Sequence, residues 1–258
     1  MPSLNLTALA SLRISAHLIP SYSNIPNTSS HSHPLLIYHS AWPPSTSPSA
    51  IEAHLPSNGL VPQWRYTMYT TTHYHSNTHE VLCVVQGRAK LLFGGEKNPE
   101  NVEAEVKAGD AIVVPAGVGH RLLEDYGEDG GFQMVGSYPE GCDWDMCYGK
   151  SGEEEKARAV AKVAWLKKDP LYGNDGPALW SKDKLEKQGR DGKVLKKAPG
   201  HRPEKAALEM LKKPIHVYYL AIAATSSSAK LPNPPSSSCT PSSQLSSPSS
   251  LSTMPSIV

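Results

Sequence analysis

The chain has 258 residues, of which 39% are hydrophobic, and its formal net charge at pH 7 is +1. So small a net charge excludes a protein whose whole surface attracts nucleic acid or an acidic membrane. Hydrophobic residues are sparse in the Ser- and Pro-rich C-terminal stretch, so the sequence predicts that the core lies upstream of it.

Cysteine use and the N-terminus bear on the cellular compartment. The four cysteines include no CxxC pair and are too few for a secreted disulfide scaffold, which favours a reducing environment. The N-terminus lacks the basic start and apolar run of a secretory signal peptide, although its lack of acidic residues before Glu52 weakly resembles an organellar transit peptide. The longest apolar run, residues 217–224, is far shorter than the roughly 20 residues of a membrane helix. We predict a cytoplasmic protein with no membrane partner.

The first 51 residues are rich in Ser, Pro and Asn and contain one strand-like insert at residues 34–38. Its sequence, Pro-Leu-Leu-Ile-Tyr, is typical of a strand that adds to the edge of a sheet. We expect residues 1–11 to be flexible and the rest of this stretch to wrap around the domain. Because an edge strand can pair with a second copy of itself, the insert also motivates the hypothesis of a homodimer.

Short β-type runs separated by turn residues fill the chain from residue 64 to residue 137. Gly87 separates two runs, and residues 94–99 and 107–110 form turns. Antiparallel strands at this spacing form a sandwich or a barrel. Within the second run Cys83 alternates with inward-facing neighbours, so we expect it to be buried under a covering segment. The predicted strands are residues 64–69, 80–86, 88–93, 104–106, 111–114, 120–124 and 132–137.

The chain after the strands predicts three further segments. Residues 152–166 place three glutamates in a first turn and apolar residues at helical spacing, which predicts a helix packed on the barrel. Residues 181–213 are basic, but interspersed acidic residues favour a solvated linker with a weak helix at 203–213 over a nucleic-acid tether or nuclear signal. We therefore assign a domain to residues 12–180, a basic linker to 181–224 and a disordered low-complexity tail to 225–258.

Two separated groups of residues indicate a metal site. His73 and His75 form an HxH pair, and residues i and i+2 of an extended strand share one face, so both imidazoles can reach one ion. Glu80 follows His75 after four residues, and Gly87 follows Glu80 after six more. The second group is a glycine, five residues, Pro-Ala-Gly, two residues and His120. These groups resemble the two motifs of the cupin superfamily, HxH(x)4E(x)6G and G(x)5PxG(x)2H.

The resemblance implies an antiparallel jelly-roll β-barrel in which His73, His75, Glu80 and His120 bind a divalent metal. Three imidazoles and one carboxylate suit Fe, Mn, Ni, Cu or Zn, and an octahedral ion with four protein ligands keeps two positions open. The alternative is that the three histidines are only hydrogen-bonded residues of the barrel.

Strand parity adds a condition on this site. If the strand ran on unbroken from His73, His79 would share its face and Glu80 would point away. The sequence therefore predicts a turn or bulge around residues 76–78, with His79 either at the rim of the site or directly beside its ligands, and a ligand itself only as the less favoured alternative.

Further segments resemble a narrower group, the YjlB-like single-cupin proteins of microbes, and the likeness covers about residues 12–180. Within them Trp144 and Asp145 are interpreted first as a packing and capping device, and second as residues of the barrel mouth. The segments are residues 25–27, 35–38, 116–120, 136–145 and 169–177, together with Trp180.

We predict a metal-dependent enzyme of the oxygenase, oxidase or isomerase type that acts on a small oxygenated substrate. The alternative is a non-catalytic module that binds a small sugar or acid, with a structural metal or none. A third hypothesis makes residues 181–213 the working part and the barrel an oligomerisation scaffold. We expect a small-molecule ligand and no nucleic-acid partner. The sequence does not define the reaction or its catalytic residues.

Overall fold

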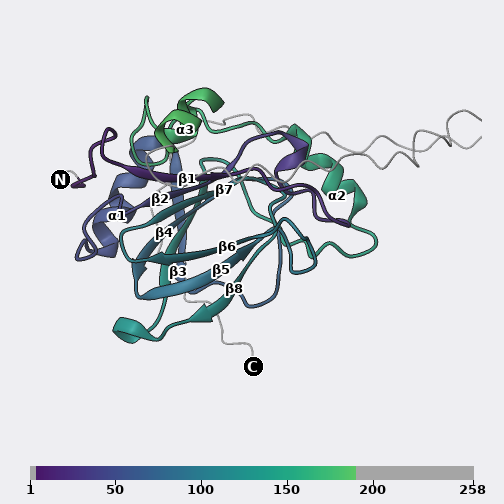
Figure 1. The fold of residues 1–258 in the computed structure, drawn as a ribbon, viewed down its shortest axis with the longest axis horizontal. Helices are drawn as coiled ribbons and strands as arrows, with labels where there is room; N and C mark the ends of the chain where they lie inside the picture. The colour runs from purple at the N-terminus through teal and green to yellow at the C-terminus, as the bar shows by residue number, and fades with distance from the viewer. Residues whose placement is uncertain (1–3, 190–258) are drawn as a thin grey trace, which may run out of the picture. The chain divides into compact units, whose positions relative to one another are not determined.

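The computed structural model describes residues 4–189, and their strands form two antiparallel sheets. In Figure 1 the smaller sheet lies against one face of the larger, which is the arrangement of a jelly-roll barrel. This confirms the predicted all-β fold. The larger sheet contains, in spatial order, β1 (Arg13–His17), β2 (Leu35–His39), β7 (Ala111–Val114), β4 (Glu80–Gln86), β9 (Gln133–Pro139) and β3 (Leu60–Tyr66); the smaller contains β6 (Val102–Lys107), β5 (Arg88–Phe93) and β8 (His120–Asp125).

Apolar side chains fill the space between the two sheets. Leu82 and Val84 of β4 belong to this core, because alternate residues of a strand share one face. Leu91 and Phe93 of β5 pack in the same cluster, and all four side chains are at most 1% exposed. Burying each such side chain stabilises the fold by about 1.5–3 kcal/mol. This core holds the two sheets together.

The opposite face of the larger sheet is also covered. Val81 and Cys83 of β4 belong to a second core that includes Ile51 of helix α1 (Pro48–His54) and Leu185 of helix α3 (Lys182–Gly189). Cys83 is fully buried, as predicted, and this burial raises the pKa of its thiol to about 12. Because both faces of β4 are packed, its sequence is a continuous apolar run.

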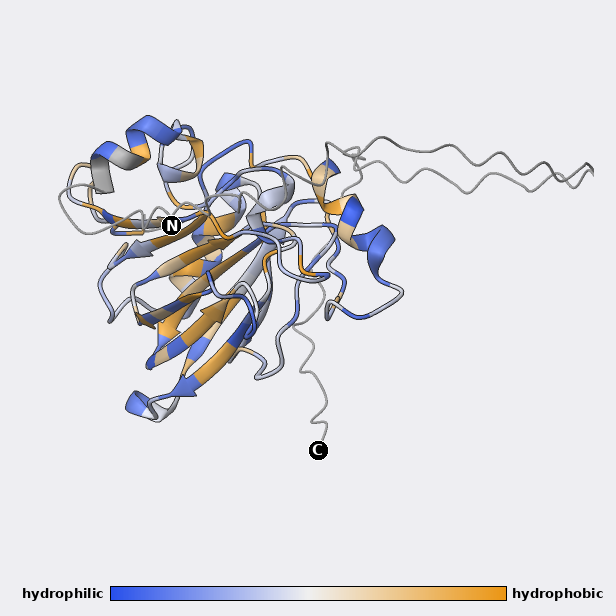
Figure 2. Cartoon of the chain, turned by 45° about the vertical axis from the view of Figure 1, so that its right-hand side comes forward, coloured by the Kyte–Doolittle hydropathy of each residue, from blue (hydrophilic) through white to orange (hydrophobic). Residues whose placement is uncertain are grey.

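The helices are short. The side chain of Ser47 accepts a hydrogen bond from the amide of Ala50 and so caps α1. Helix α2 (Glu154–Ala159) and the 3-10 helix η4 (Val160–Lys162) fill only part of the helix predicted at 152–166, because the backbone becomes extended at Val163. Figure 2 shows hydrophobic residues along the strands and mostly hydrophilic residues in α2 and α3. The other 3-10 helices are η1 (Asn27–Ser30), η2 (Leu55–Asn58), η3 (Glu128–Gly130) and η5 (Pro177–Leu179).

The N-terminal strand β1 corrects one prediction. The strand-like insert forms β2, but β2 is not at the edge of the sheet, since Ile37 pairs with Ser15 of β1 on one side and with Ile112 of β7 on the other. The proposed mode of dimerisation through residues 35–38 is therefore wrong, because β1 occupies that edge. The homodimer itself stays a prediction.

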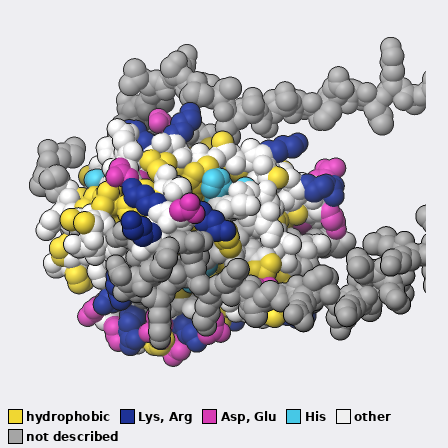
Figure 3. Space-filling model, turned by 45° about the horizontal axis from the view of Figure 1, so that its top comes forward, with side chains coloured by type: hydrophobic (Ala, Val, Ile, Leu, Met, Phe, Trp, Pro, Cys, Tyr) yellow, Lys and Arg dark blue, Asp and Glu magenta, His cyan; other side chains and the backbone are white. Residues whose placement is uncertain are grey.

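Two predicted C-terminal segments fall outside residues 4–189. The weak helix at 203–213 and the disordered tail at 225–258 lie there, and the domain boundaries stay predictions. Helix α3 falls within the predicted linker, yet its Leu185 packs in the second core, on the face of the larger sheet opposite the smaller sheet, which is called the outer core below. Residues 4–189 contain no helix with the length and apolar character needed to cross a membrane. Where described residues are visible in Figure 3, basic and acidic side chains are intermingled on that face.

Candidate metal centre

Three histidines meet where β4 and β8 begin. His73 and His75 lie in the segment between β3 and β4, and His120 is the first residue of β8. His73 and His120 form an antiparallel bridge, in which the amide of each donates to the carbonyl of the other, at 3.2 and 2.8 Å. The ligand nitrogens that the three side chains offer lie within 4.8 Å of one another, and each residue is at most 4% exposed. This group can hold a metal ion.

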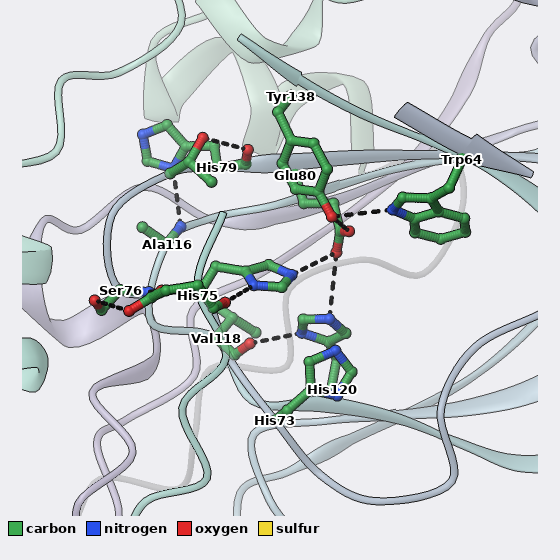
Figure 4. A network of polar contacts seen from close by, with 12 residues as sticks. Trp64, His73, His75, Ser76, His79, Glu80, Ala116, Val118, His120 and Tyr138 are labelled. Atoms are coloured by element: carbon green, nitrogen blue, oxygen red, sulfur yellow. Dashed lines mark hydrogen bonds and ion pairs between the residues drawn. The ribbon is translucent and has the colours of Figure 1, made fainter. Parts of the chain in front are cut away.

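Each imidazole is oriented by a backbone carbonyl group. Nδ1 of His73 lies 3.1 Å from one carbonyl oxygen, and Nδ1 of His120 lies 2.9 Å from another. Nδ1 of His75 bonds to the carbonyl of Asp145 (Figure 4). Because a carbonyl can only accept, Nδ1 carries the proton in each bond. In a neutral imidazole Nε2 then has a free lone pair, which is the state that metal coordination requires.

Glu80 faces the same space from the first residue of β4. Its Oε2 lies 3.5 Å from Nε2 of His75 and 3.2 Å from Nε2 of His120, and the side chain is 3% exposed. Within residues 4–189, Glu80 Oε2 and His75 Nε2 are among the few buried side-chain polar atoms without an aligned hydrogen bond. Buried polar atoms of this kind call for a partner. Three histidine nitrogens within 4.8 Å of one another, with a carboxylate oxygen beside two of these histidines, fit a divalent transition metal.

The charges of this cluster are coupled. Burial alone would raise the pKa of Glu80, but His75 and His120 outweigh it and hold this pKa well below its usual range. Burial opposes protonation of His75 as well, yet the carboxylate of Glu80 raises the pKa of His75 above its ordinary value. Glu80 is therefore ionised, and a bound cation would balance its charge.

The segment between His75 and Glu80 bends as the parity condition requires, with a bend at Ser76 and Asn77. His79 is only 1% exposed, so of its two predicted positions it takes the buried one beside the ligands and not the rim. Its Nδ1 accepts a hydrogen bond from the amide of Ala116 at 2.9 Å, and its Nε2 lies 3.1 Å from the carbonyl oxygen of Ala164. Both ring nitrogens are thus engaged by the backbone, and His79 fixes the loop that precedes His120.

Asp145 holds the HxH segment in place. Its carbonyl orients His75, and its carboxylate accepts hydrogen bonds from the amide and the hydroxyl of Ser76 at 2.7 and 2.8 Å. Lys156 of α2 lies 3.1 Å from the same carboxylate. The Asp145 carboxylate thus caps the backbone amide of Ser76, as the capping interpretation expects. The sequence pattern does not indicate that the carbonyl of Asp145 also bonds to His75.

Aromatic rings border the histidines. Trp144 contacts the ring of His75 edge-on at 5.9 Å and stacks on Tyr138 at 6.0 Å between ring centroids. Tyr69 contacts His73 edge-on at 5.6 Å and is 50% exposed, which identifies the solvent side of the cluster. Trp144 therefore lies beside the candidate metal site, as the barrel-mouth interpretation expects.

In the metal-free protein we expect two histidines to reduce stability in acid. Burial lowers the pKa of His73 to about 3, with His120 adding to the effect, and burial also lowers the pKa of His79 to about 3. An unfolded histidine titrates near pH 6.5, so the unfolded chain binds protons that the native state does not. The stabilising contribution of each is full above about pH 6.5 and is lost as the pH falls toward 3, at up to about 1.4 kcal/mol per pH unit.

Urea unfolding of chelator-treated protein between pH 7 and pH 5 measures this effect. The variant His79→Asn keeps an acceptor near Ala116 but does not titrate, so its free energy of unfolding should fall less steeply than that of the wild type. If the free energy of unfolding falls equally steeply with pH in the two proteins, His79 does not cause the loss of stability in acid.

The sequence around the histidine cluster is similar to one known protein family. The sequence profile of the cupin family matches residues 69–125, which include all three histidines and Glu80. The uncharacterized protein YjlB of Bacillus subtilis (strain 168) is 35% identical over 164 residues, which are 63% of this chain and 93% of YjlB.

Two solved structures are more distant. Oxalate decarboxylase from Bacillus subtilis at pH 4.6 is 16% identical, with a TM-score of 0.27, over 45% of this chain and 23% of that one. Procruciferin, an 11S globulin from Brassica napus, is 12% identical, with a TM-score of 0.25, over 45% of this chain and 22% of that one. The match thus spans less than a quarter of each structure. The match to nearly the whole of YjlB and the cupin profile over the histidine cluster show that the chain belongs to the cupin superfamily, in the group of YjlB.

Proposed function

We propose that the chain binds one divalent transition metal through His73, His75, Glu80 and His120, and that it is a metal-dependent enzyme acting on a small oxygenated substrate. One observation carries this proposal. Backbone carbonyls engage Nδ1 of all three imidazoles, the ligand nitrogens that these histidines offer lie within 4.8 Å of one another, and Oε2 of Glu80 lies beside two of them. A set of histidines with purely structural hydrogen bonds does not need this convergence.

The residues of the chain have separate tasks in this scheme. The histidines supply three neutral ligands whose rings cannot rotate freely, because each Nδ1–H is bound. Glu80 supplies one negative charge. When bound, a divalent metal supplies Lewis acidity and open coordination positions for substrate oxygens or dioxygen. An octahedral ion held by four protein ligands would keep two positions open.

The surroundings of the site support a substrate with little charge. The buried residues within 4–189 include no lysine and no arginine. The core between the sheets is formed by apolar side chains such as Met68 and Phe93. A substrate group that enters this core would therefore meet apolar surface, which makes several negative charges costly to bury. This favours a neutral or singly charged oxygenated compound of the diketone, flavonol or hydroxy-acid class over a polyanion.

The experiment has two stages. The purified protein is analysed for metals by mass spectrometry, and we expect close to one equivalent of a transition metal. The loaded protein is then tested for oxygen consumption and for product formation with panels of diketones, flavonols, thiols and organic acids. Protein without stoichiometric metal after incubation with Fe, Mn, Ni, Cu or Zn salts would overturn the proposal. If the protein binds metal and also binds one of the test compounds, but converts none of them, the result would favour the non-catalytic sugar- or acid-binding module.

A further inference from the structure

The two oxygens of Glu80 have different partners. Oε2 faces the histidines, whereas Oε1 accepts a hydrogen bond of 2.6 Å from the hydroxyl of Tyr138 (Figure 4). Both residues are at most 2% exposed, so water does not compete strongly for this bond. A hydrogen bond to a buried carboxylate is short and strong compared with a bond between neutral groups. Rotation of the Glu80 carboxylate therefore has to break it.

Sheet register places Tyr138 opposite Glu80. Strands β4 and β9 pair antiparallel, with Leu82 opposite Gly136 and Val81 opposite Ser137. One further step in this register brings Glu80 to Tyr138. Because directly opposite residues of an antiparallel pair project to the same face, both side chains point toward the histidine cluster. The contact is thus fixed by backbone pairing rather than by a loop.

A third residue fixes the hydroxyl of Tyr138. Nε1 of Trp64, on strand β3, donates to this oxygen at 3.1 Å. With its acceptor lone pair used by Trp64, the hydroxyl directs its own proton to Glu80. The three side chains form a chain of hydrogen bonds across three neighbouring strands, from Trp64 through Tyr138 to Glu80.

The indole reaches Tyr138 only because residue 136 has no side chain. Trp64 is paired with Gly136 across β3 and β9, and a Cβ atom at residue 136 would lie 2.0 Å from Cε2 of the indole. The backbone of Gly136 is not left-handed, so the glycine is required for space and not for its conformation. Gly136 therefore opens the path along which Trp64 supports Tyr138.

We propose that Tyr138, supported by Trp64, is a positioning residue that presents a single oxygen of Glu80 to the metal. The inference rests on the proposed metal site and deepens it. With Oε1 held by Tyr138, Glu80 would offer only Oε2 to a bound ion and would not occupy a second coordination position. This keeps that position available for a substrate oxygen.

The test uses Co²⁺ as the probe, because its visible absorption depends on the number and arrangement of its ligands. The full-length wild type, Tyr138→Phe and Trp64→Phe are titrated with Co²⁺. Loss of the Tyr138 hydroxyl should weaken Co²⁺ binding by about 10- to 100-fold, as is typical for partners of metal ligands, and should change the spectrum. Trp64→Phe, which removes the indole N–H, should change both in the same direction by less.

Tyr38→Phe is the matched control. Tyr38 is fully buried and donates to the buried carboxylate of Asp169 at 2.8 Å, in the outer core away from the histidines. This variant should lower the unfolding temperature but keep the wild-type Co²⁺ affinity and spectrum. If Tyr138→Phe folds and matches the wild type in both readouts, the positioning role is overturned while the metal site stands. If Tyr138→Phe does not fold, wild-type behaviour of Trp64→Phe overturns it. Failure of the wild type itself to bind Co²⁺ overturns the proposed function.

Discussion

Replacement of His73, His75 or His120 by alanine should abolish stoichiometric metal binding. Each substitution removes one of three converging Nε2 atoms and leaves an incomplete ligand set. Since loss of a hydrogen-bond partner of a ligand already weakens binding by about 10- to 100-fold, loss of a ligand should weaken it by more than about 100-fold. Equilibrium dialysis against each metal followed by elemental analysis measures this directly.

The same variants should lose the stabilisation that metal gives to the folded chain. A metal at 100 times its Kd stabilises the wild type by about 2.7 kcal/mol, and a variant with 100-fold weaker binding gains only about 0.4 kcal/mol under the same conditions. For a domain of this size the difference is a shift of roughly 5–10 °C in the unfolding temperature on addition of metal. Differential scanning fluorimetry with and without a chelator gives this shift.

His79→Asn is the control for a buried histidine near the site. His79 is as buried as the other three, but both of its ring nitrogens bond to the backbone. Its substitution should lower stability yet leave one equivalent of metal bound. The proposed ligand set would be contradicted by metal loss in His79→Asn together with full metal content in His73→Ala and His120→Ala.

Much of the barrel could be predicted from local sequence because its strands are short and separated by turn residues. β4, β5 and β7 have the predicted bounds, and Gly87 turns the chain between β4 and β5 with a positive φ of 69°. The bend between His75 and Glu80 followed from strand parity once the cupin resemblance had placed both residues in one site. Local patterns succeed where neighbouring residues decide the structure.

The features that could not be predicted from the sequence depend on contacts between residues that are distant in the chain. Strand β1 has a single strand partner, β2, and its polar and apolar residues alternate without a strong β signal. The partners of the site residues lie far along the chain: Asp145 is 70 residues from His75, and Tyr138 is 58 residues from Glu80. No spacing rule in a single sequence connects such pairs. The ligands carry a motif, whereas the residues that orient them do not.

Asp169→Ala should be among the most destabilising single substitutions in the domain. The carboxylate of Asp169 is fully buried; Oδ1 accepts hydrogen bonds from the amides of Leu171 and Tyr172, and Oδ2 accepts from the amide of Ala178 and from the hydroxyl of Tyr38 on β2. Alanine would leave four donors without an acceptor in a buried setting. Each such donor costs about 1–3 kcal/mol, so we expect a loss of at least about 4 kcal/mol in the free energy of unfolding, measured by urea titration.

Asp169→Asn separates the hydrogen bonds from the shape of the side chain. Asparagine keeps one acceptor oxygen for Leu171 and Tyr172 but turns an NH2 group toward the amide of Ala178. Asp169→Asn should therefore lower the free energy of unfolding by less than Asp169→Ala does. Because the bond to Tyr38 ties this C-terminal segment to β2, both variants should also expose the segment to limited proteolysis before the barrel unfolds. If Asp169→Ala unfolds at the wild-type urea concentration, residues 169–178 contribute little to the domain, and its boundary lies upstream of them.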